Sequence, residues 1–435
     1  MIDSCRFRFG HGDGAVDVVR PQGAVAGAMT RAEAVALDAA DPLGAFRDAF
    51  LPVADGSVVA YLDGNSLGRP PAATLDRLSA LIRDEWGSRL IRGWSEGWFE
   101  LPHRLGDELG AAALGAAPGQ VILGDSTTVW LYKLLRAAMT ARPGRTEIVT
   151  DVDNFPTDRY VVEGIAAELG CRVRWLRPDP AAGVTPAQVR DAVGPDTAVV
   201  TLSHVAYRSA FIADMAAITA VAHEAGALTV WDLCHSAGSV PVALDECGAD
   251  FAVGCTYKFL CGGPGAPAFG YVPRRHADGL RQPIQGWIGH ADPFAMEQGY
   301  RPAAGIGRLQ SGTPPILGLA AAAEGIRLVA EAGIERIRAK AVALTEMAVA
   351  LSDAWLAPRG VTLGSPRDPR LRGGHVTLCR PDAAALSRDL IEAGVIVDYR
   401  PPDGIRVGLS PLSTGYEELW RAMDAMRDVV SEAGR

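Results

Sequence analysis

The sequence predicts an α/β fold with a large domain and a smaller α+β domain at its C-terminal end. From about Val58, short apolar strands alternate with amphipathic helical stretches, which is the order found in α/β proteins. The strands are apolar along their whole length, as expected where helices cover both faces of a sheet. After the Pro-rich turn at 312–316, a long Ala-rich helical segment leads to a shorter region with its own strands.

Each expected element is a short run bounded by polar, Gly or Pro residues. Strands are expected at 58–63, 120–124, 146–151, 172–176, 197–205, 227–233, 250–255 and 266–272. Helices are expected at 74–86, 127–139 and 214–226. In the C-terminal region, strands at 374–380 and 404–410 precede a last helix near 416–432.

The expected domain organisation follows from these elements. Residues 1–28 have neither helical nor strand period and are expected to be a loose leader, with translation starting at Met1 or Met29. Residues 29–75 are expected to be an N-terminal segment that packs with the small domain. The large, cofactor-binding domain is expected at 76–315 and the small domain at 316–435. A chain of 435 residues, 48% of them hydrophobic, can bury a core in both domains.

Composition and charge narrow the class of function. The net charge is −9 and no Lys/Arg block stands out, so a small-molecule substrate is expected and a nucleic-acid partner is not. No apolar run approaches the ~20 residues of a membrane helix, and the first residues lack the apolar core of a secretory signal. The seven cysteines are scattered without a CxxC pair, which is typical of thiols in a reducing cytoplasm. No His/Cys/carboxylate spacing suggests a metal site.

Lys258 and Asp232 are the residues that say most about function. Lys258 follows the expected strand at 250–255, and Asp232 stands at the end of the strand at 227–233. Alone, the lysine would be read as a turn residue with a solvated amine, and the aspartate as a cap. Ligands of open α/β sheets bind at the carboxyl ends of strands, however, where both residues fall. Together they predict a pyridoxal 5′-phosphate (PLP) site, in which the amine holds the cofactor aldehyde covalently and the carboxylate keeps the pyridine nitrogen protonated.

Two further segments could complete such a site. Residues 125–128 (DSTT) follow a strand and open a helix, so they offer backbone N–H groups and hydroxyls to a phosphate. An ordinary Ser/Thr N-cap would have the same local pattern. In DNFPTDRY at 153–160, Phe155 could stack on the pyridine ring and Asp158 could bond its polar substituents. Taken alone, Phe155 would be a core residue.

A serine hydrolase is the rival hypothesis from another mechanistic class. GNSLG at 64–68 fits the G-x-S-x-G nucleophile elbow, with Ser66 as nucleophile, and it follows a strand. The motif lies before most of the α/β strands, however, whereas several strands normally precede that nucleophile.

A dinucleotide-binding interpretation of the Gly-rich segments is weak, because neither GIG at 305–307 nor the GGPG loop opens a helix after a strand.

A series of motifs runs in one order from about Tyr61 to Tyr416: YLDGNSLG, WGSRLIRGW, DSTTVWLYKLL, NFPTDRY, LSHVAYRS, WDLCHSAGSVPV, CTYKF, QGWIGH, SGTPPI and PDGIRV. In these motifs the chain resembles the kynureninase family, within the class V branch of fold-type-I PLP enzymes. The resemblance implies a mixed, mostly parallel seven-stranded sheet in the large domain. It also implies a cytoplasmic homodimer of tryptophan catabolism, with its sites at the subunit interface. The reaction it implies is hydrolysis of the Cβ–Cγ bond of L-kynurenine, or of a ring-substituted kynurenine, to an anthranilate and L-alanine.

The resemblance also assigns roles to individual residues. It implies that Lys258 carries PLP, that Asp232 bonds the ring nitrogen and that Tyr257 is a proton shuttle and phosphate contact. It places Asn65 and Arg406 at the substrate α-carboxylate. The other expected cofactor contacts are Thr127, Thr128, Phe155, Asp158, Ser203 and His235, with the partner subunit's Trp287 and the partner subunit's Thr313.

Three positions depart from the family pattern. Trp130, Ala206 and Cys261 stand where asparagine is usual. If Trp130 and Ala206 face the pocket, it loses hydrogen-bonding groups and would accept a bulkier or less polar aryl ketone. The alternative is another PLP reaction on this scaffold, lyase or transaminase chemistry on a different amino acid.

Overall fold

The computed structural model describes residues 29–433, and the expected leader at 1–28 lies outside this range. A seven-stranded sheet forms the centre of the large domain, in the order β2-β8-β7-β6-β5-β3-β4. All its neighbouring strands are parallel except β8, which is antiparallel to both β2 and β7. The strands are β2 (Val121–Gly124), β3 (Glu147–Asp151), β4 (Arg172–Leu176), β5 (Thr197–Ser203), β6 (Leu228–Asp232), β7 (Phe251–Cys255) and β8 (Ala268–Tyr271).

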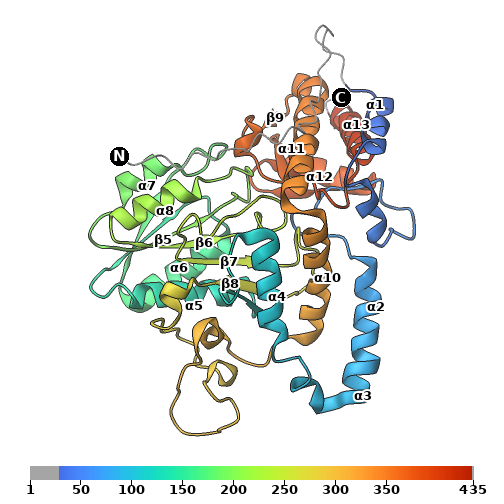
Figure 1. Cartoon of the computed structure of the whole chain (residues 1–435). Coiled ribbons are helices and arrows are strands. Elements are labelled where there is room, and N and C mark those ends of the chain that lie inside the picture. Colours follow the sequence, from blue (N-terminus) through green and yellow to red (C-terminus); the bar gives the residue numbers. More distant parts are fainter. Residues whose placement is uncertain (1–28, 434–435) are drawn as a thin grey trace, which may run out of the picture.

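Helices cover both faces of this sheet (Figure 1). One face packs on α5 (Thr127–Thr140) and α6 (Pro156–Leu169). The other packs on α4 (Leu101–Leu109), α7 (Pro186–Ala192), α8 (Met215–Glu224) and α10 (Ile316–Ala332). Because successive strand residues point to opposite faces, Asp232 lies on the α5 face with Leu228 and Val230.

The small domain is built on a four-stranded antiparallel sheet in the order β12-β13-β10-β9. Its strands are β9 (Thr362–Leu363), β10 (His375–Cys379), β12 (Asp398–Arg400) and β13 (Gly404–Gly408), and its helices are α11 (Ile334–Leu351), α12 (Ala383–Glu392) and α13 (Tyr416–Ala433). The N-terminal segment joins it: β1 (Ala60–Tyr61) pairs in parallel with β11 (Val395–Ile396), and α1 (Arg31–Ala39) packs on α13. Figure 1 shows α1 beside α13.

The helix α10 packs with the large domain, against α4 and α2 (Ala72–Ala80). Leu319 and Ile326 of α10 lie in the same hydrophobic core as α4. The expected boundary at 315/316 precedes this helix, whereas the packing places the start of the small domain after it. The boundary could not be predicted from the sequence because α10 and α11 are both Ala-rich and apolar. They differ in the elements they pack against, which are α4 and α2 for α10 and α13 and β10 for α11.

The expected strands and helices agree closely with those of the structure. Each expected strand contains one, and 58–63 contains β1, which lies in the small domain. The helix expected at 74–86 begins as α2 and continues as the π-helix η2 (Leu81–Trp86). Among residues 29–433, no helix is both long and apolar enough to cross a bilayer.

Candidate active site

The carboxyl ends of three neighbouring strands bring the key residues together. Ser203 ends β5 and is the register partner of Asp232, which ends β6, and Lys258 follows β7 by three residues. Lys258 is 8% exposed, and its Nζ lies 3.4 Å from Nε2 of His235. This edge of the sheet is where an open α/β fold places its ligand.

Lys258 differs from the other lysines of the chain. The sequence contains only Lys133, Lys258 and Lys340, and all three are buried. Lys133 is paired with Asp125 at 2.5 Å and Lys340 with Asp41 at 2.7 Å. Among residues 29–433, no carboxylate lies within ion-pair distance of Lys258. Lys258 is therefore the one lysine whose amine is not engaged in an ion pair among the described residues, which leaves it placed for covalent chemistry.

Two carboxyl groups lie near this amine in different environments. Asp232 accepts hydrogen bonds from the backbone N–H of Cys234 at 2.8 Å and from Ser203 Oγ at 3.2 Å. Asp158, in the first turn of α6, is buried and its Oδ2 has no partner in the described part of the chain. Burial, and next the charge of Asp232, raise the pKa of Asp158 well above its usual value, while Lys258 opposes the shift. The Asp158 carboxyl therefore favours its protonated form, in which it can donate a hydrogen bond.

Aromatic rings flank the amine. The ring centroids of Phe155 and Tyr257 each lie 5.8 Å from Lys258 Nζ, and Phe155 meets Tyr207 edge to face at 5.3 Å. Burial raises the pKa of Tyr257, so its phenol stays protonated near neutral pH. Burial, and next the charge of Lys258, lower the pKa of His235 well below its usual value, so its imidazole is neutral.

The start of α5 forms the other end of the site. Ser126 caps the helix by accepting from the backbone N–H of Val129, and Thr127 and Thr128 form its first turn. A cavity of about 450 Å³ opens here, and its walls include Thr127, Tyr257 and Thr313 of the same chain. Trp287 does not belong to this cavity wall; it is 42% exposed and contacts Phe294.

Arg406 and Asn65 lie at the junction with the small domain. The guanidinium of Arg406, on β13, donates to Asp398 Oδ2 at 2.6 Å, to Ser66 Oγ at 2.9 Å and to the Tyr207 carbonyl at 2.8 Å. Its Nη1 is also 3.4 Å from His235 Nε2, which connects it to Lys258. Asn65 is fully buried, and both polar atoms of its amide lack a partner within residues 29–433.

These residues fit PLP and an amino-acid substrate. Buried polar atoms are normally hydrogen-bonded, yet the amide nitrogen of Asn154, the Oδ2 of Asp158 and the amide of Asn65 are not. Asp158 interacts with Lys258 and Asp232, Asn154 and Asp232 bond the same Ser203 hydroxyl, and Asn65 precedes Ser66, which bonds Arg406. Unpaired polar atoms beside these residues are what a polar cofactor and substrate would satisfy.

The serine-hydrolase hypothesis finds no support in this geometry. Ser66 Oγ accepts a hydrogen bond from Arg406. Burial raises the pKa of Asp63 to about 6, and the Ser66 hydroxyl partly opposes this rise by hydrogen-bonding to the carboxylate. No histidine among residues 29–433 hydrogen-bonds to Ser66. A nucleophilic serine needs an adjacent base, and this serine contacts an arginine and an aspartate instead.

The three departures from the family pattern lie in different places. Trp130 is buried in the large-domain core, where its indole N–H donates to the Gly124 carbonyl at 2.8 Å and its ring fills the space beside Gly270. It lines the cavity at the α5 end, whose walls do not include Arg406, so a substrate pocket widened beside Arg406 does not follow from it. Cys261 is buried against Gly68, and burial raises the pKa of its thiol to about 12.

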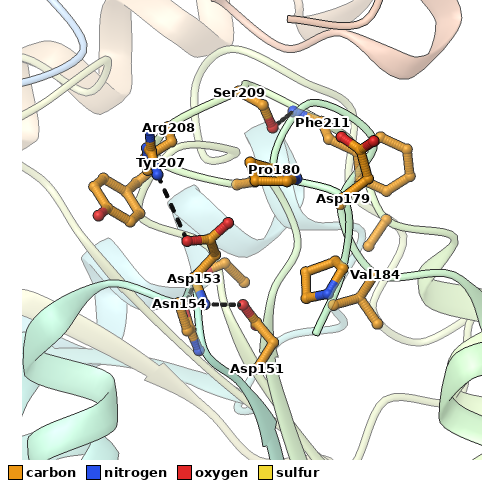
Figure 2. A pocket seen from close by; sticks show the side chains of 15 residues that line it. Asp151, Asp153, Asn154, Asp179, Pro180, Val184, Tyr207, Arg208, Ser209 and Phe211 are labelled. Carbon is orange, nitrogen blue, oxygen red and sulfur yellow. Dashed lines mark hydrogen bonds and ion pairs between the residues drawn. The ribbon is translucent and has the colours of Figure 1, made fainter. Parts of the chain in front are cut away.

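Ala206 alone of the three lies beside the polar residues at the end of β5. It lines a cavity of about 30 Å³ with Ser203, Asn154 and Tyr207 (Figure 2). Asn154 accepts from Ser203 Oγ at 2.7 Å. Neither Asn154 nor Tyr207 was predicted as a site residue, although both stand inside motifs that were singled out.

Asp151, at the end of β3, should make stability depend on pH. It lines the cavity in Figure 2, and burial raises its pKa to about 7, with the neighbouring Asp153 contributing. The unfolded chain releases this proton near pH 4, so the stabilisation is complete below pH 4 and is lost as the pH rises to 7. At about 1.4 kcal/mol per pKa unit, the three-unit difference amounts to ~4 kcal/mol at most.

Asp151→Asn should therefore flatten the pH dependence. Urea unfolding of the wild type between pH 5 and 8 should show a falling midpoint, and the variant a smaller fall. Equal slopes for the two proteins would contradict a proton held by Asp151 in the folded state.

Comparisons with known proteins first define the class. A family model of class V aminotransferases matches residues 111–373. A cysteine desulfurase of Thermococcus onnurineus NA1, solved in its apo form, is similar at a TM-score of 0.75 and 18% identity, covering 86% of this chain and 95% of that one. The fold is that of class V, fold-type-I PLP enzymes, and the expectation of a mixed, mostly parallel sheet is confirmed.

A narrower assignment follows from closer relatives. The model of the kynureninase C-terminal domain matches residues 337–426. Kynureninase of Pseudomonas fluorescens is 44% identical over 409 residues, which cover 92% of this chain and 95% of that protein. Kynureninase of Burkholderia pseudomallei (strain 1106a) is 43% identical over 413 residues, covering 93% and 97%. The chain belongs to the kynureninase family.

Proposed function

We propose that this protein is a PLP-dependent hydrolase that cleaves the Cβ–Cγ bond of L-kynurenine, or of a ring-substituted kynurenine, to an anthranilate and L-alanine. The observation that carries the proposal is Lys258, a buried lysine without a counter-ion, beside Asp232 and one histidine away from Arg406. Family membership supports the same reaction, because the relatives that match nearly their whole length are kynureninases.

Each residue of the site has a task in this reaction. Lys258 would hold the cofactor, and its amine, when free, would take the proton from the substrate Cα. Bound PLP supplies an electron sink for the electrons that this proton leaves behind. Asp232 keeps the pyridine nitrogen protonated. Tyr257, still a phenol at neutral pH, can pass a proton near the γ-carbonyl, to which water adds before the Cβ–Cγ bond breaks.

The cofactor phosphate belongs at the start of α5 in this proposal. Thr127 and Thr128 offer hydroxyls and backbone N–H groups at the positive end of a 14-residue helix, and Tyr257 faces the same cavity. Phe155 would stack on the ring, and the unpaired Oδ2 of Asp158 and amide nitrogen of Asn154 would bond its polar substituents. Ser203 and His235 complete the surroundings of Asp232 and Lys258.

Arg406→Lys should raise the KM for the amino acid about ten- to hundredfold, because a lysine cannot copy a bidentate fork to the substrate carboxylate. PLP affinity should not change. The matched control is Arg400→Lys, since Arg400 binds the same Asp398 but does not contact His235 or Ser66. Initial rates over a range of substrate concentrations check this, and an unchanged KM for Arg406→Lys would remove Arg406 from the site.

We also propose a homodimer with its sites at the interface, working in the cytoplasm. Apolar side chains lie open on η2, on the 3₁₀ helix η3 (Leu90–Trp94) and on the loop near 290, among them Ile91 at 78% and Met296 at 79% exposure. Trp94, Phe99 and Phe294 link the two segments through ring contacts of 5.0 and 5.7 Å. Patches of this kind commonly mark protein interfaces. The exposed Trp287 contacts Phe294 of this patch, and Thr313 is also exposed, as contacts to a partner's site require. Cys234, Cys255 and Cys261 carry free thiols, which supports a reducing compartment.

The decisive test is a substrate panel. The protein with PLP is incubated with L-kynurenine, 3-hydroxykynurenine and ring-substituted kynurenines, and alanine is measured with the matching anthranilate. Both products from any substrate support the proposal, and the best substrate shows which aryl group the site prefers. If none gives alanine while another amino acid loses its side chain or amino group, the reaction is a different one on the same scaffold.

A further inference from the structure

A buried lysine stands behind the proposed phosphate site. Lys133, on α5, is 0% exposed, and its ammonium has three partners. It donates to Asp125 Oδ2 at 2.5 Å and to the Leu309 carbonyl at 2.6 Å, and it lies 4.8 Å from the centre of the Trp130 ring. A buried ion pair adds little net stability, because desolvation of both charges offsets their attraction. What such a pair does provide is a fixed position for the groups that it holds.

The first of these groups is the turn between β2 and α5. Asp125 has a φ of +42°, in the left-handed region that residues other than glycine rarely adopt. Its carbonyl accepts from the backbone N–H of Ala268 at 3.0 Å, and its carboxylate is held by Lys133 and by Ser311 Oγ at 3.2 Å. Ser126, the cap of α5, follows directly. The conformation of Asp125 thus sets where the first turn of α5 points.

The second group is the segment around Leu309 and Ser311, which leads to Thr313. The Ser311 carbonyl accepts from the backbone N–H of Ile288 at 3.4 Å, and a Cβ at Gly286 would lie 2.0 Å from its oxygen. The loop that carries Trp287 therefore rests on this segment. The cavity of about 450 Å³ lies between the turn at 124–127 and the segment at 310–315. One buried ion pair holds both walls of that cavity.

We propose that Lys133 is a positioning residue for the cofactor phosphate, because it fixes Asp125 in its left-handed turn and ties that turn to the 309–313 segment. The inference rests on the proposed placement of the phosphate at the start of α5. Lys133 does not contact the phosphate directly, and it acts through Asp125 and Leu309. Replacing it should weaken binding of the phosphate group and leave binding of the pyridine ring unchanged.

The chain contains a matched control. Lys340, on α11, is also buried and pairs with Asp41 at 2.7 Å, but it joins that helix to the N-terminal segment. Lys133→Met and Lys340→Met therefore each remove a buried ammonium and its ion pair, although Asp125 is 27% exposed and Asp41 only 1%. Apoprotein of each is titrated with PLP and with pyridoxal, which has the same ring and aldehyde but no phosphate, and binding is followed by absorbance.

Lys133→Met should weaken PLP binding about tenfold or more and pyridoxal binding less than about twofold, the loss expected when hydrogen bonds to a charged group are displaced. Lys340→Met should lower the thermal midpoint and leave the ratio of the two affinities unchanged. Equal losses for PLP and pyridoxal in Lys133→Met, or no loss, would overturn the proposal. If Lys133→Met does not fold, Ser311→Ala replaces it, with a smaller loss in the same direction expected and an unchanged ratio counting against the proposal.

Thr127→Val distinguishes a failure of the role proposed for Lys133 from a failure of the proposed phosphate site at α5. If Thr127→Val changes the ratio of PLP to pyridoxal affinity and Lys133→Met does not, only the role of Lys133 fails. If neither variant changes the ratio, the placement of the phosphate at α5 fails as well.

Discussion

Replacing Lys258 by alanine should abolish turnover, with a loss of at least ~10³–10⁴-fold, because the same amine holds the cofactor and moves the Cα proton. The wild-type protein should be yellow, and borohydride should fix the colour to the peptide that contains Lys258. Lys258→Ala should still bind PLP through the phosphate and ring contacts, but borohydride should leave no labelled peptide.

Peptide mapping after reduction is unusually clear for this chain, because it has only three lysines. Lys133 and Lys340 are buried in ion pairs and serve as internal controls. Label on either of them, or a colourless protein that ignores added PLP, would remove Lys258 from its proposed role. The serine-hydrolase hypothesis makes the opposite forecast, in which Ser66→Ala stops turnover and PLP is irrelevant.

The parts of the fold that depend on local pattern could be predicted from the sequence. Apolar runs predicted the strands of the large sheet, and the alternation of strands and helices indicated an α/β fold with ligand groups at the carboxyl ends of strands. For the same reason Lys258 and Asp232 could be paired, since each closely follows a strand whose position was clear. Their separation of 26 positions in the sequence did not matter once both strands lay in one sheet.

Contacts between distant segments could not be predicted. Arg406 bonds Ser66, 340 positions away, and the Tyr207 carbonyl, 199 positions away, and no local pattern encodes either contact. From the sequence, Trp130 on α5 could be taken for a pocket residue, because the Gly270 against which it packs lies far along the chain on β8. The role inferred for Lys133 likewise needs Leu309, which only the folded chain brings near. Residue type and spacing therefore defined the chemistry, and long-range packing decided which side chains support it.

Asp232→Ala should lower kcat far more than it lowers PLP affinity. Without the carboxylate the pyridine nitrogen loses its proton, so the ring no longer takes up the electrons left on the substrate Cα. PLP should still bind through Lys258 and the start of α5, and the thermal midpoint of the holoprotein should change little. Each tenfold loss in kcat corresponds to about 1.4 kcal/mol of transition-state stabilisation.

The matched control for this prediction is Asp250→Ala, because Asp250 lies just before β7, at the amino end of a strand of the same sheet. Asp250 is as buried as Asp232 and accepts from His223 at 2.7 Å, His276 at 2.8 Å and the backbone N–H of Thr229 at 2.9 Å. Its loss should destabilise the fold, by about 3–5 kcal/mol as for other broken buried pairs, without changing kcat per bound PLP. Single-turnover rates at saturating PLP compare the two variants. A loss of less than roughly tenfold for Asp232→Ala, equal to that of Asp250→Ala, would mean that Asp232 supports the sheet and is not the partner of the ring nitrogen.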